Sequence, residues 1–250
     1  SEHFFGPQYD LHGGAGELKF PHHEAEIAQQ ESASGKKPFV KYWVHTGVVT
    51  VGNTKMSKSL GNFITGKEMI DHNDPDAFRF MVVSRLYRSP LPYSEKLLTQ
   101  AKQNLETIRD FARRLKQVKA RAGTSLDIAS YHKQFFARMD DDFNTPSALA
   151  VIFTLMRKAN TLMKQEKLSA KDAKQALAFL KEVENIIGVP LTNTISTPIP
   201  QAITALAKER NSLRTQGKWA EADGLRARIS EQGYIVKDTK DGFEIIPRGE

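Results

Sequence analysis

The hydrophobic pattern of this 250-residue chain changes at about Thr65, and that change limits the folds open to it. Before it, short β-branched runs at residues 40–45 and 48–51 are separated by glycines and polar turns, as is typical of β-strands. After it, apolar residues recur every three or four positions, most clearly over 97–118, as in amphipathic helices. The sequence therefore predicts a mixed α/β part followed by a largely helical remainder.

Helix-start residues support this division. Thr65 and Glu68 have the spacing of a capping box, and Asp74 precedes a proline that suits the first turn of a helix. An earlier helix over 21–33 also begins on a proline, with acidic residues in its opening turn. Further elements are predicted as helices at 126–139, 146–165, 170–187, 201–215 and 219–232, and as short strands at 234–236 and 243–246.

The composition excludes several classes of protein. No run approaches the ~20 apolar residues of a membrane helix, and the first residues lack the pattern of a secretory signal. We therefore expect a cytoplasmic location. The absence of cysteine excludes a disulfide scaffold, a thiol nucleophile and a thiolate metal site built from this chain alone.

The excess of positive over negative charge lies in one segment. Residues 79–121 contain 11 Lys or Arg against 3 Asp or Glu, whereas the rest of the chain is nearly balanced. On the predicted helix these cations would lie off the apolar face and could meet nucleic-acid phosphates, although a run of charge is more often a solvated surface. The residues concerned are Arg109, Arg113, Arg114, Lys116 and Lys119.

A lysine-containing loop follows the predicted strand at 48–51. Residues 54–62 read Thr-Lys-Met-Ser-Lys-Ser-Leu-Gly-Asn, which places Lys55 and Lys58 three positions apart among small hydroxyl side chains. Two ammonium groups in a mobile loop can stabilise the charge of a departing pyrophosphate, whereas a generic lysine pair is usually a solvated turn. The whole string resembles the Lys-Met-Ser-Lys-Ser loop of class I aminoacyl-tRNA synthetases, which activate an amino acid with ATP.

A second string, Phe-Pro-His-His-Glu-Ala-Glu at 20–26, lies at a predicted helix start. Four positions apart on a helix, His22 and Glu26 would share one face and could bind one zinc ion. An exposed helical pair is the commoner outcome of such spacing. The patterns of metalloproteases are absent, so that class is excluded.

Further strings make the resemblance more specific. The histidine-glutamate string, with Asp-Leu-His-Gly-Gly at 10–14 and Ile-Ala-Gln at 27–29, is similar to cysteinyl-tRNA synthetases. Residues 139–146 match a string of that family's helical domain, and 219–223 with 238–239 match its small terminal domain. The resemblance implies an α/β catalytic remnant, the second half of a Rossmann-like class I synthetase domain, followed by an α-helical bundle and a small α+β terminal domain.

The resemblance also implies a division into five segments. The predicted boundaries are 1–70 for the second half of the catalytic domain, 71–121 for a stem-contact region with the long basic helix, 122–189 for the helical bundle, 190–200 for a linker rich in Thr, Ser and Pro, and 201–250 for a small anticodon-binding domain.

Roles for individual residues follow from the same resemblance. Lys55 and Lys58 are the expected catalytic residues, and ATP, with Mg²⁺, is expected to contact Gly14, Glu17 and Lys58. His22 and Glu26 are expected to bind zinc together with two cysteines from outside this sequence, so that the metal selects a cysteine thiolate over a serine hydroxyl. The expected anticodon-binding residues are Arg214, Trp219, Asp223 and Asp238, with Trp219 as a core anchor in the alternative.

The expected partners are tRNA(Cys), ATP and L-cysteine, with no membrane, and the expected assembly is a monomer. The family's His-Ile-Gly-His string and the first half of its nucleotide-binding fold should precede Ser1, so we expect a carboxyl-terminal portion of a longer enzyme. Ala15, Glu17 and Ala25 depart from the family pattern. Two alternatives stay open at this point: the ligase that joins cysteine to an amino sugar in mycothiol synthesis, and a non-catalytic tRNA-binding remnant.

Overall fold

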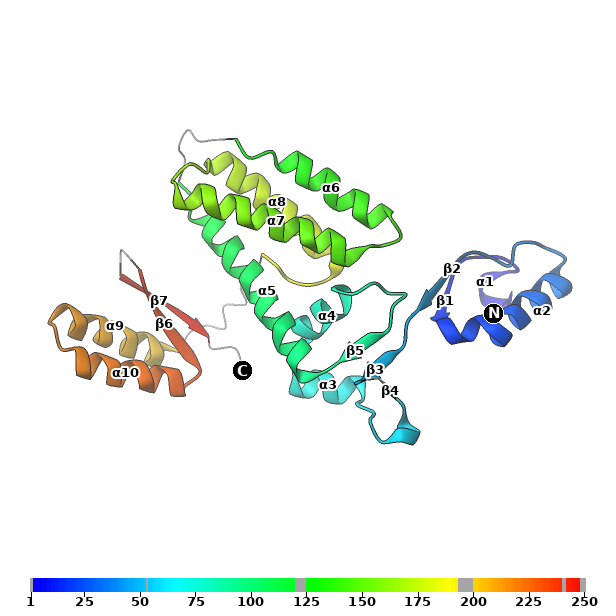
Figure 1. Ribbon diagram of the computed structural model, residues 1–250, viewed down its shortest axis with the longest axis horizontal. Helices are drawn as coiled ribbons and strands as arrows, with labels where there is room; N and C mark the ends of the chain where they lie inside the picture. The colour runs from blue at the N-terminus through cyan, green and yellow to red at the C-terminus, as the bar shows by residue number, and fades with distance from the viewer. Residues whose placement is uncertain (1, 53, 120–124, 193–199, 240–241, 248–250) are drawn as a thin grey trace. The chain divides into compact units, whose positions relative to one another are not determined.

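The structure is a computed structural model that describes residues 2–52, 54–119, 125–192, 200–239 and 242–247 (Figure 1). The chain forms two compact units, Ser1–Thr192 and Asn193–Glu250, each of which is described by itself. None of the helices in these ranges is long and apolar enough to cross a membrane.

Unit 1 begins with a parallel pair of strands joined through a helix. After α1 (Glu2–Phe5), β1 (Tyr9–Ala15) lies beside β2 (Val40–Thr46), and α2 (Glu24–Ser34) lies between them in sequence. A parallel pair requires such a crossover connection. The register sets His12 opposite Trp43 and Gly14 opposite His45, so these four residues occupy the same face of the pair.

A second, three-stranded sheet follows in the order β4-β3-β5. Its strands are β3 (Val49–Val51), β4 (Thr54–Lys55) and β5 (Leu91–Tyr93); β3 is antiparallel to β4 and parallel to β5. The chain enters β3 past Gly47, where an added Cβ would lie 2.1 Å from the backbone oxygen of Ser89. Only glycine allows this close approach of two backbone segments.

The remainder of unit 1 is helical, as predicted. Both predicted caps are confirmed: Thr65 and Glu68 form a capping box, and the Asp74 carboxylate accepts hydrogen bonds from the first turn of the next helix. Figure 1 shows α6, α7 and α8 side by side, and of these three helices α7 and α8 pack against the long helix α5. The helices are α3 (Gly66–His72), α4 (Pro75–Val83), α5 (Glu95–Lys116), α6 (Ile128–Asp140), α7 (Thr145–Lys164) and α8 (Ala170–Ile187).

One hydrophobic core joins all these helices. Its fully buried side chains include Ile108 of α5, Phe135 of α6, Ile152 of α7 and Leu180 of α8. Burying a side chain of this kind contributes about 1.5 to 3 kcal/mol to stability. The boundary predicted between residues 121 and 122 lies outside the described residues, but described side chains before and after it, from Met69 to Leu191, belong to the same core, so it does not separate two cores.

The predicted linker at 190–200 begins too early. Leu191 and Thr192 are buried in unit 1, and their backbone N–H groups donate to the carboxylate of Glu184 at 3.1 and 3.0 Å. Two side chains of α5 also hold this segment: Arg109 donates to the carbonyl of Pro190 and Lys116 to that of Thr192. A string rich in Thr and Pro suggested a linker, but these partners order its first three residues. Residues 193–199 lie outside the described ranges.

Unit 2 is a helical hairpin packed against a two-stranded antiparallel sheet. Its elements are α9 (Gln201–Thr215), α10 (Trp219–Glu231), β6 (Tyr234–Thr239) and β7 (Gly242–Pro247). The described core contains Ile203 and Ala207 from α9, Ile229 from α10 and Val236 from β6. Unit 2 therefore has a hydrophobic core of its own.

Candidate functional site

Three histidines from different elements, His12, His23 and His45, lie together on one face of the β1-β2 pair. His23 is 5% exposed, and its Nδ1 lies 2.8 Å from Nε2 of His45 on β2. The ring of His12 on β1 stacks on Trp43 with 4.8 Å between centroids, and its centroid lies 5.0 Å from that of His23. The parallel register brings these residues together although 33 positions separate His12 from His45.

Gly14 makes room for this packing. An added Cβ at residue 14 would lie 2.7 Å from Cε1 of His23, closer than a Cβ ever approaches another heavy atom. The buried imidazole can therefore rest against β1 only because residue 14 has no side chain. Sequence reasoning assigned Gly14 to ATP, which stays a prediction; its contact with His23 was not foreseen.

His12, His23 and Glu26 form a group that could hold a metal ion. Their ligand atoms all lie within 4.8 Å of one another, and Nε2 of His12 is 3.5 Å from Oε2 of Glu26. Two imidazole nitrogens and a carboxylate oxygen are a donor set that zinc accepts in a tetrahedral site. A metal-bound histidine normally has a hydrogen-bond partner on its other ring nitrogen, and His45 is in that position for Nδ1 of His23. The Nε2 atom of His23 is then the one that could bind a metal ion.

His22, the predicted zinc ligand, is not in this group. Its side chain is exposed, whereas the adjacent His23 is buried. The prediction assumed an α-helix that begins at residue 21, but α2 begins at Glu24, and the turn before it is π-helical with an extended Phe20 inside it. The role of His22 stays a prediction, and Glu26 belongs both to the predicted pair and to the observed group.

The pKa of His45 is lowered, which favours a neutral ring in this cluster. Burial is the main cause, because removing an imidazolium from water is unfavourable, and the charge of Lys19 and the neighbouring rings of His23 and His12 act in the same direction. A neutral imidazole can accept or donate one hydrogen bond, as its contact with His23 requires.

The lysine loop is closed by side-chain contacts at its base. Asn62 accepts a hydrogen bond from the backbone of Ser57 at 2.9 Å and donates to the carbonyl of Lys55 at 3.2 Å. Gly61 ends the loop in the left-handed region at φ 65°, which favours glycine. The loop therefore has a defined shape that its nine-residue string alone does not reveal.

The two lysines of the loop have different surroundings. Nζ of Lys55 donates to both carboxylate oxygens of Glu17, at 2.6 and 2.7 Å. Nζ of Lys58 lies 5.5 Å from the centroid of the Phe63 ring, and within the described ranges no carboxylate reaches it. Lys58 is thus an exposed cation available to an anion, whereas Lys55 already has a partner in one of the residues predicted to contact ATP.

An exposed tryptophan and an arginine lie together on unit 2. Trp219, the first residue of α10, is 60% exposed, and the guanidinium of Arg214 lies 5.6 Å from its ring centroid. The alternative that Trp219 is a core anchor is wrong, because the ring lies outside the described core. Asp223 is exposed one turn further along α10. A flat ring beside a guanidinium is a surface on which an unpaired base can stack.

Asp238 on β6 forms ion pairs with Arg210 and Arg214 of α9. The hydrogen bonds from Arg210 are the main cause of a pKa of about 2 for this carboxyl; burial opposes the shift, and Arg214 adds to it. Arg210 is 2% exposed and was not singled out in the sequence, because nothing in the residues around it marks a buried arginine.

Three family models match successive regions of the chain. Residues 1–103 match the family model for the catalytic domain of class I (C) tRNA synthetases, 134–192 match the DALR domain, and 196–245 match the anticodon-binding domain of cysteinyl-tRNA ligase. The chain belongs to the cysteinyl-tRNA synthetase family. Relatives include proteins named cysteine-tRNA ligase from Chlorobium chlorochromatii, 39% identical over 248 residues, and from Oenococcus oeni, 38% identical over 250 residues.

These relatives are longer than this member of the cysteinyl-tRNA synthetase family. The alignments cover 96% and 98% of this chain but 51% and 53% of the two relatives, so the chain spans about half their length. The fold is similar to that of the methionyl-tRNA synthetase of Mycobacterium tuberculosis, with a TM-score of 0.52 and 18% identity over 71% of this chain and 40% of that one. A LeuRS of Agrobacterium radiobacter K84 has a TM-score of 0.51 and 16% identity over 73% and 28%.

Within this synthetase-family chain, the basic helix α5 differs from its prediction. Arg109 is buried, where it pairs with Asp76 at 2.6 Å and Glu106 at 2.8 Å, so it cannot meet phosphates. Arg113 and Arg114 both pair with Asp110. The charge count over residues 79–121 could not reveal this pairing, because Asp76 lies on α4, before that segment. Lys119, just beyond the helix, is exposed.

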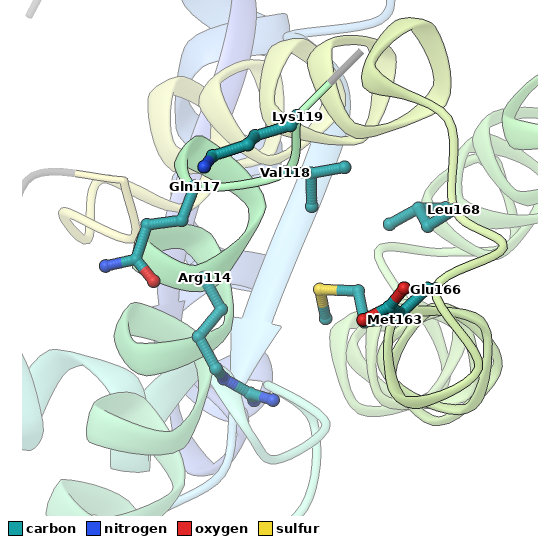
Figure 2. Close-up of a pocket in the computed structure, with 7 residues that line it drawn as sticks. All are labelled: Arg114, Gln117, Val118, Lys119, Met163, Glu166 and Leu168. Atoms are coloured by element: carbon teal, nitrogen blue, oxygen red, sulfur yellow. The ribbon is translucent and has the colours of Figure 1, made fainter. Parts of the chain in front are cut away.

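The end of α5 borders a hollow on unit 1. Figure 2 shows Arg114, Gln117 and Lys119 on its α5 side, with Met163 and Leu168 across from them. Glu166 also lines the hollow, so its rim has cationic, acidic and apolar sections.

The string at residues 139–146 has a structural role in this member of the family. Asp142 accepts hydrogen bonds from Tyr87 Oη at 2.8 Å and from Arg88 at 2.6 Å, so the turn between α6 and α7 is fixed to the segment after α4. The hydrogen bond from Tyr87 is the main reason that the pKa of Asp142 is lowered; burial opposes the shift, and Arg88 adds to it. The backbone of Asp142 has φ 56°, which aspartate tolerates better than most residues.

Proposed function

We propose that this chain supplies the carboxyl-terminal portion of a cysteine-tRNA ligase, an ATP-dependent enzyme that attaches L-cysteine to tRNA(Cys). The observation that carries the proposal is that one chain has an imidazole-carboxylate group and a lysine loop in unit 1 and, in unit 2, an exposed Trp219 with Arg214 against its ring. A ligase that joins cysteine to an amino sugar has no use for such a surface.

The reaction needs no protein nucleophile. The carboxylate of cysteine attacks the α-phosphorus of ATP, and pyrophosphate leaves with its electron pair. A ribose hydroxyl at the tRNA end then attacks the acyl carbon, AMP leaves, and the hydroxyl proton is released. The enzyme accelerates such a reaction by orienting the reactants and stabilising charge that develops in the transition state.

Lys58 is the residue of this chain best placed to stabilise the departing pyrophosphate. It is exposed, and its charge is not neutralised by a carboxylate from the described part of the chain. Lys55 would reach the phosphates after exchanging Glu17 for a phosphate oxygen. Since both side chains of that ion pair are about half exposed, solvent screens their attraction, and breaking the pair costs little free energy. Gly14 and Glu17 remain the proposed contacts of ATP, with Mg²⁺ as its counterion.

Zinc would be held by Glu26, one imidazole and the family's two cysteines, which together make a four-ligand site. For the imidazole, the observed group favours His12 or His23, whereas the sequence pattern favours His22. When bound, zinc supplies a soft Lewis acid that accepts a thiolate better than a hydroxyl, and so selects cysteine over serine. His45 would orient His23 through the 2.8 Å contact between their ring nitrogens.

The partner proposed for unit 2 is the anticodon of tRNA(Cys). Trp219 offers a stacking platform, Arg214 a donor fork, and Asp223 an exposed carboxylate for a base edge. We propose that the enzyme acts as a monomer in the cytoplasm.

Substitution of Lys58 tests the catalytic part of the proposal. The extended enzyme, meaning this chain extended at residue 1 to the full length of its relatives, is assayed for cysteine-dependent exchange of pyrophosphate into ATP. Lys58→Ala should lower the exchange rate by about 100-fold, as loss of one transition-state contact does, with little change in the KM for cysteine. Lys67→Ala, an exposed lysine on α3, is the matched control. An unchanged rate in Lys58→Ala would contradict the assignment.

A further inference from the structure

A buried arginine lies beneath the exposed surface of unit 2. Arg210 is 2% exposed, and its two terminal nitrogens donate to the two oxygens of Asp238 at 2.6 and 3.1 Å. Because the guanidinium does not reach the surface, Arg210 cannot contact a nucleic acid itself. Any effect on recognition must pass through Asp238.

Asp238 links the buried Arg210 to Arg214, which is partly exposed. Arg214 follows Arg210 by one turn of α9 and pairs with the same carboxylate, on Oδ2. The Arg214 guanidinium in turn lies over the Trp219 ring. Two cations at this spacing on a helix repel each other, so the shared carboxylate is what keeps both arginines in place. The contacts form a series from Arg210 through Asp238 and Arg214 to Trp219.

Stability alone does not explain an arginine at residue 210. Its Nε is buried and has no hydrogen-bond partner in the described part of the chain, and an unpartnered buried N–H costs stability. Buried ion pairs are also a weak source of stability, because apolar side chains of similar volume often serve as well. The residue is better explained by the geometry that its planar fork imposes on Asp238.

We propose that Arg210 is a positioning residue for base recognition: its two hydrogen bonds fix the Asp238 carboxylate, which holds Arg214 over Trp219. The proposal rests on the proposed function, since it takes Arg214 and Trp219 to be the groups that meet the anticodon. A merely structural Arg210 would affect folding but not the choice between RNAs.

The first test follows the Trp219 indole directly in the protein without RNA. The chain has two tryptophans, Trp43 and Trp219, so the ¹⁵N-tryptophan-labelled full chain gives two indole N–H signals, which Trp219→Phe assigns. Arg210→Lys keeps the charge but loses the fork, and Arg210→Met loses both. Both variants should shift the Trp219 signal and leave that of Trp43 unchanged. An unmoved Trp219 signal would overturn the proposal.

The second test compares binding of the same variants to tRNA(Cys) and to an anticodon-swapped tRNA(Cys). Arg210→Lys and Arg210→Met should reduce the preference for the matched anticodon by about two- to ten-fold, the range expected for one net hydrogen bond, with binding to the swapped RNA unchanged. Arg228→Lys, an exposed arginine on α10, should leave the preference and both indole signals unchanged. Equal weakening toward both RNAs with a lower melting temperature would show a structural role and overturn the proposal.

Trp219→Ala separates failure of this proposal from failure of the proposed function. If Trp219→Ala leaves the anticodon preference intact, the anticodon assignment is wrong and the positioning role falls with it. If Trp219→Ala erodes the preference but the Arg210 variants do not, the positioning role alone is wrong.

Discussion

Single residues decide the geometry of the histidine-glutamate group, and Gly14 is the clearest case. It has no Cβ, so the ring of His23 can pack against β1. Glu26 could be predicted from the sequence because a local string contains it. His12 could not be predicted as a member of the group, nor His45 as the partner of His23, because only the parallel register of β1 and β2 brings these two residues together.

Metal binding by the full chain tests this group at the level of single side chains. Glu26→Ala should weaken binding of Co²⁺, a spectroscopic substitute for zinc, by about ten-fold or more, since loss of even an outer partner has an effect of that size. The intensity of the cobalt absorption bands measures the bound fraction. Glu24→Ala, an exposed carboxylate in the same turn, is the control. Co²⁺ affinity that is unchanged in Glu26→Ala would exclude the site.

Substitution of the two adjacent histidines decides between the sequence pattern and the observed cluster. Because His23 is buried among the other ligands, His23→Ala should weaken Co²⁺ binding in the full chain more than His22→Ala does. The opposite order would support His22, as the family resemblance implies, and contradict the grouping in the structure.

Elements were easier to predict than the contacts between them. Helical periodicity is local, so the helix predicted at 97–118 is confirmed as α5, Glu95–Lys116. The partners of its charged side chains come from elsewhere in the sequence: Asp76 lies 33 positions before Arg109, and Pro190 lies 81 positions after it. For the same reason, a basic helix that looked exposed in the sequence has a buried arginine.

The end of α8 should make unit 1 sensitive to acid. Burial opposes ionisation of Glu184, but hydrogen bonds from Lys181, Thr192 and Leu191 outweigh it and lower the pKa to about 2, against an ordinary value of 4.5. A lowered folded-state pKa gives stability that is present above pH 4.5 and is lost as the pH falls toward 2. The contribution at neutral pH is about 3 kcal/mol.

Urea unfolding of the full chain at pH 7 and pH 3 measures this contribution. Glu184→Gln should lower the free energy of unfolding of unit 1 at pH 7 and reduce its loss between the two pH values. Asp71→Asn, an exposed carboxylate on α3, should leave both quantities unchanged. If Glu184→Gln loses as much unfolding free energy between pH 7 and pH 3 as the parent does, this carboxylate is not the cause of the acid sensitivity.

At the scale of the whole molecule, the two units divide the proposed work. Unit 1 contains the histidine-glutamate group and the lysine loop, and unit 2 has its own core and its own exposed aromatic surface. The order of these parts could be predicted from the strings in the sequence. The start of the linker could not, because the partners that order residues 190–192 lie on α5 and α8.

The most direct test of the proposed function is aminoacylation by the extended enzyme. Supplied with ATP and tRNA(Cys), it should attach cysteine and not serine, and the rate should fall by about ten-fold or more when the anticodon is swapped, since a lost base stack is worth roughly 1 to 3 kcal/mol. Failure to charge tRNA(Cys), or equal charging of both tRNAs together with ATP-dependent ligation of cysteine to an amino sugar, would contradict the assignment as a cysteine-tRNA ligase.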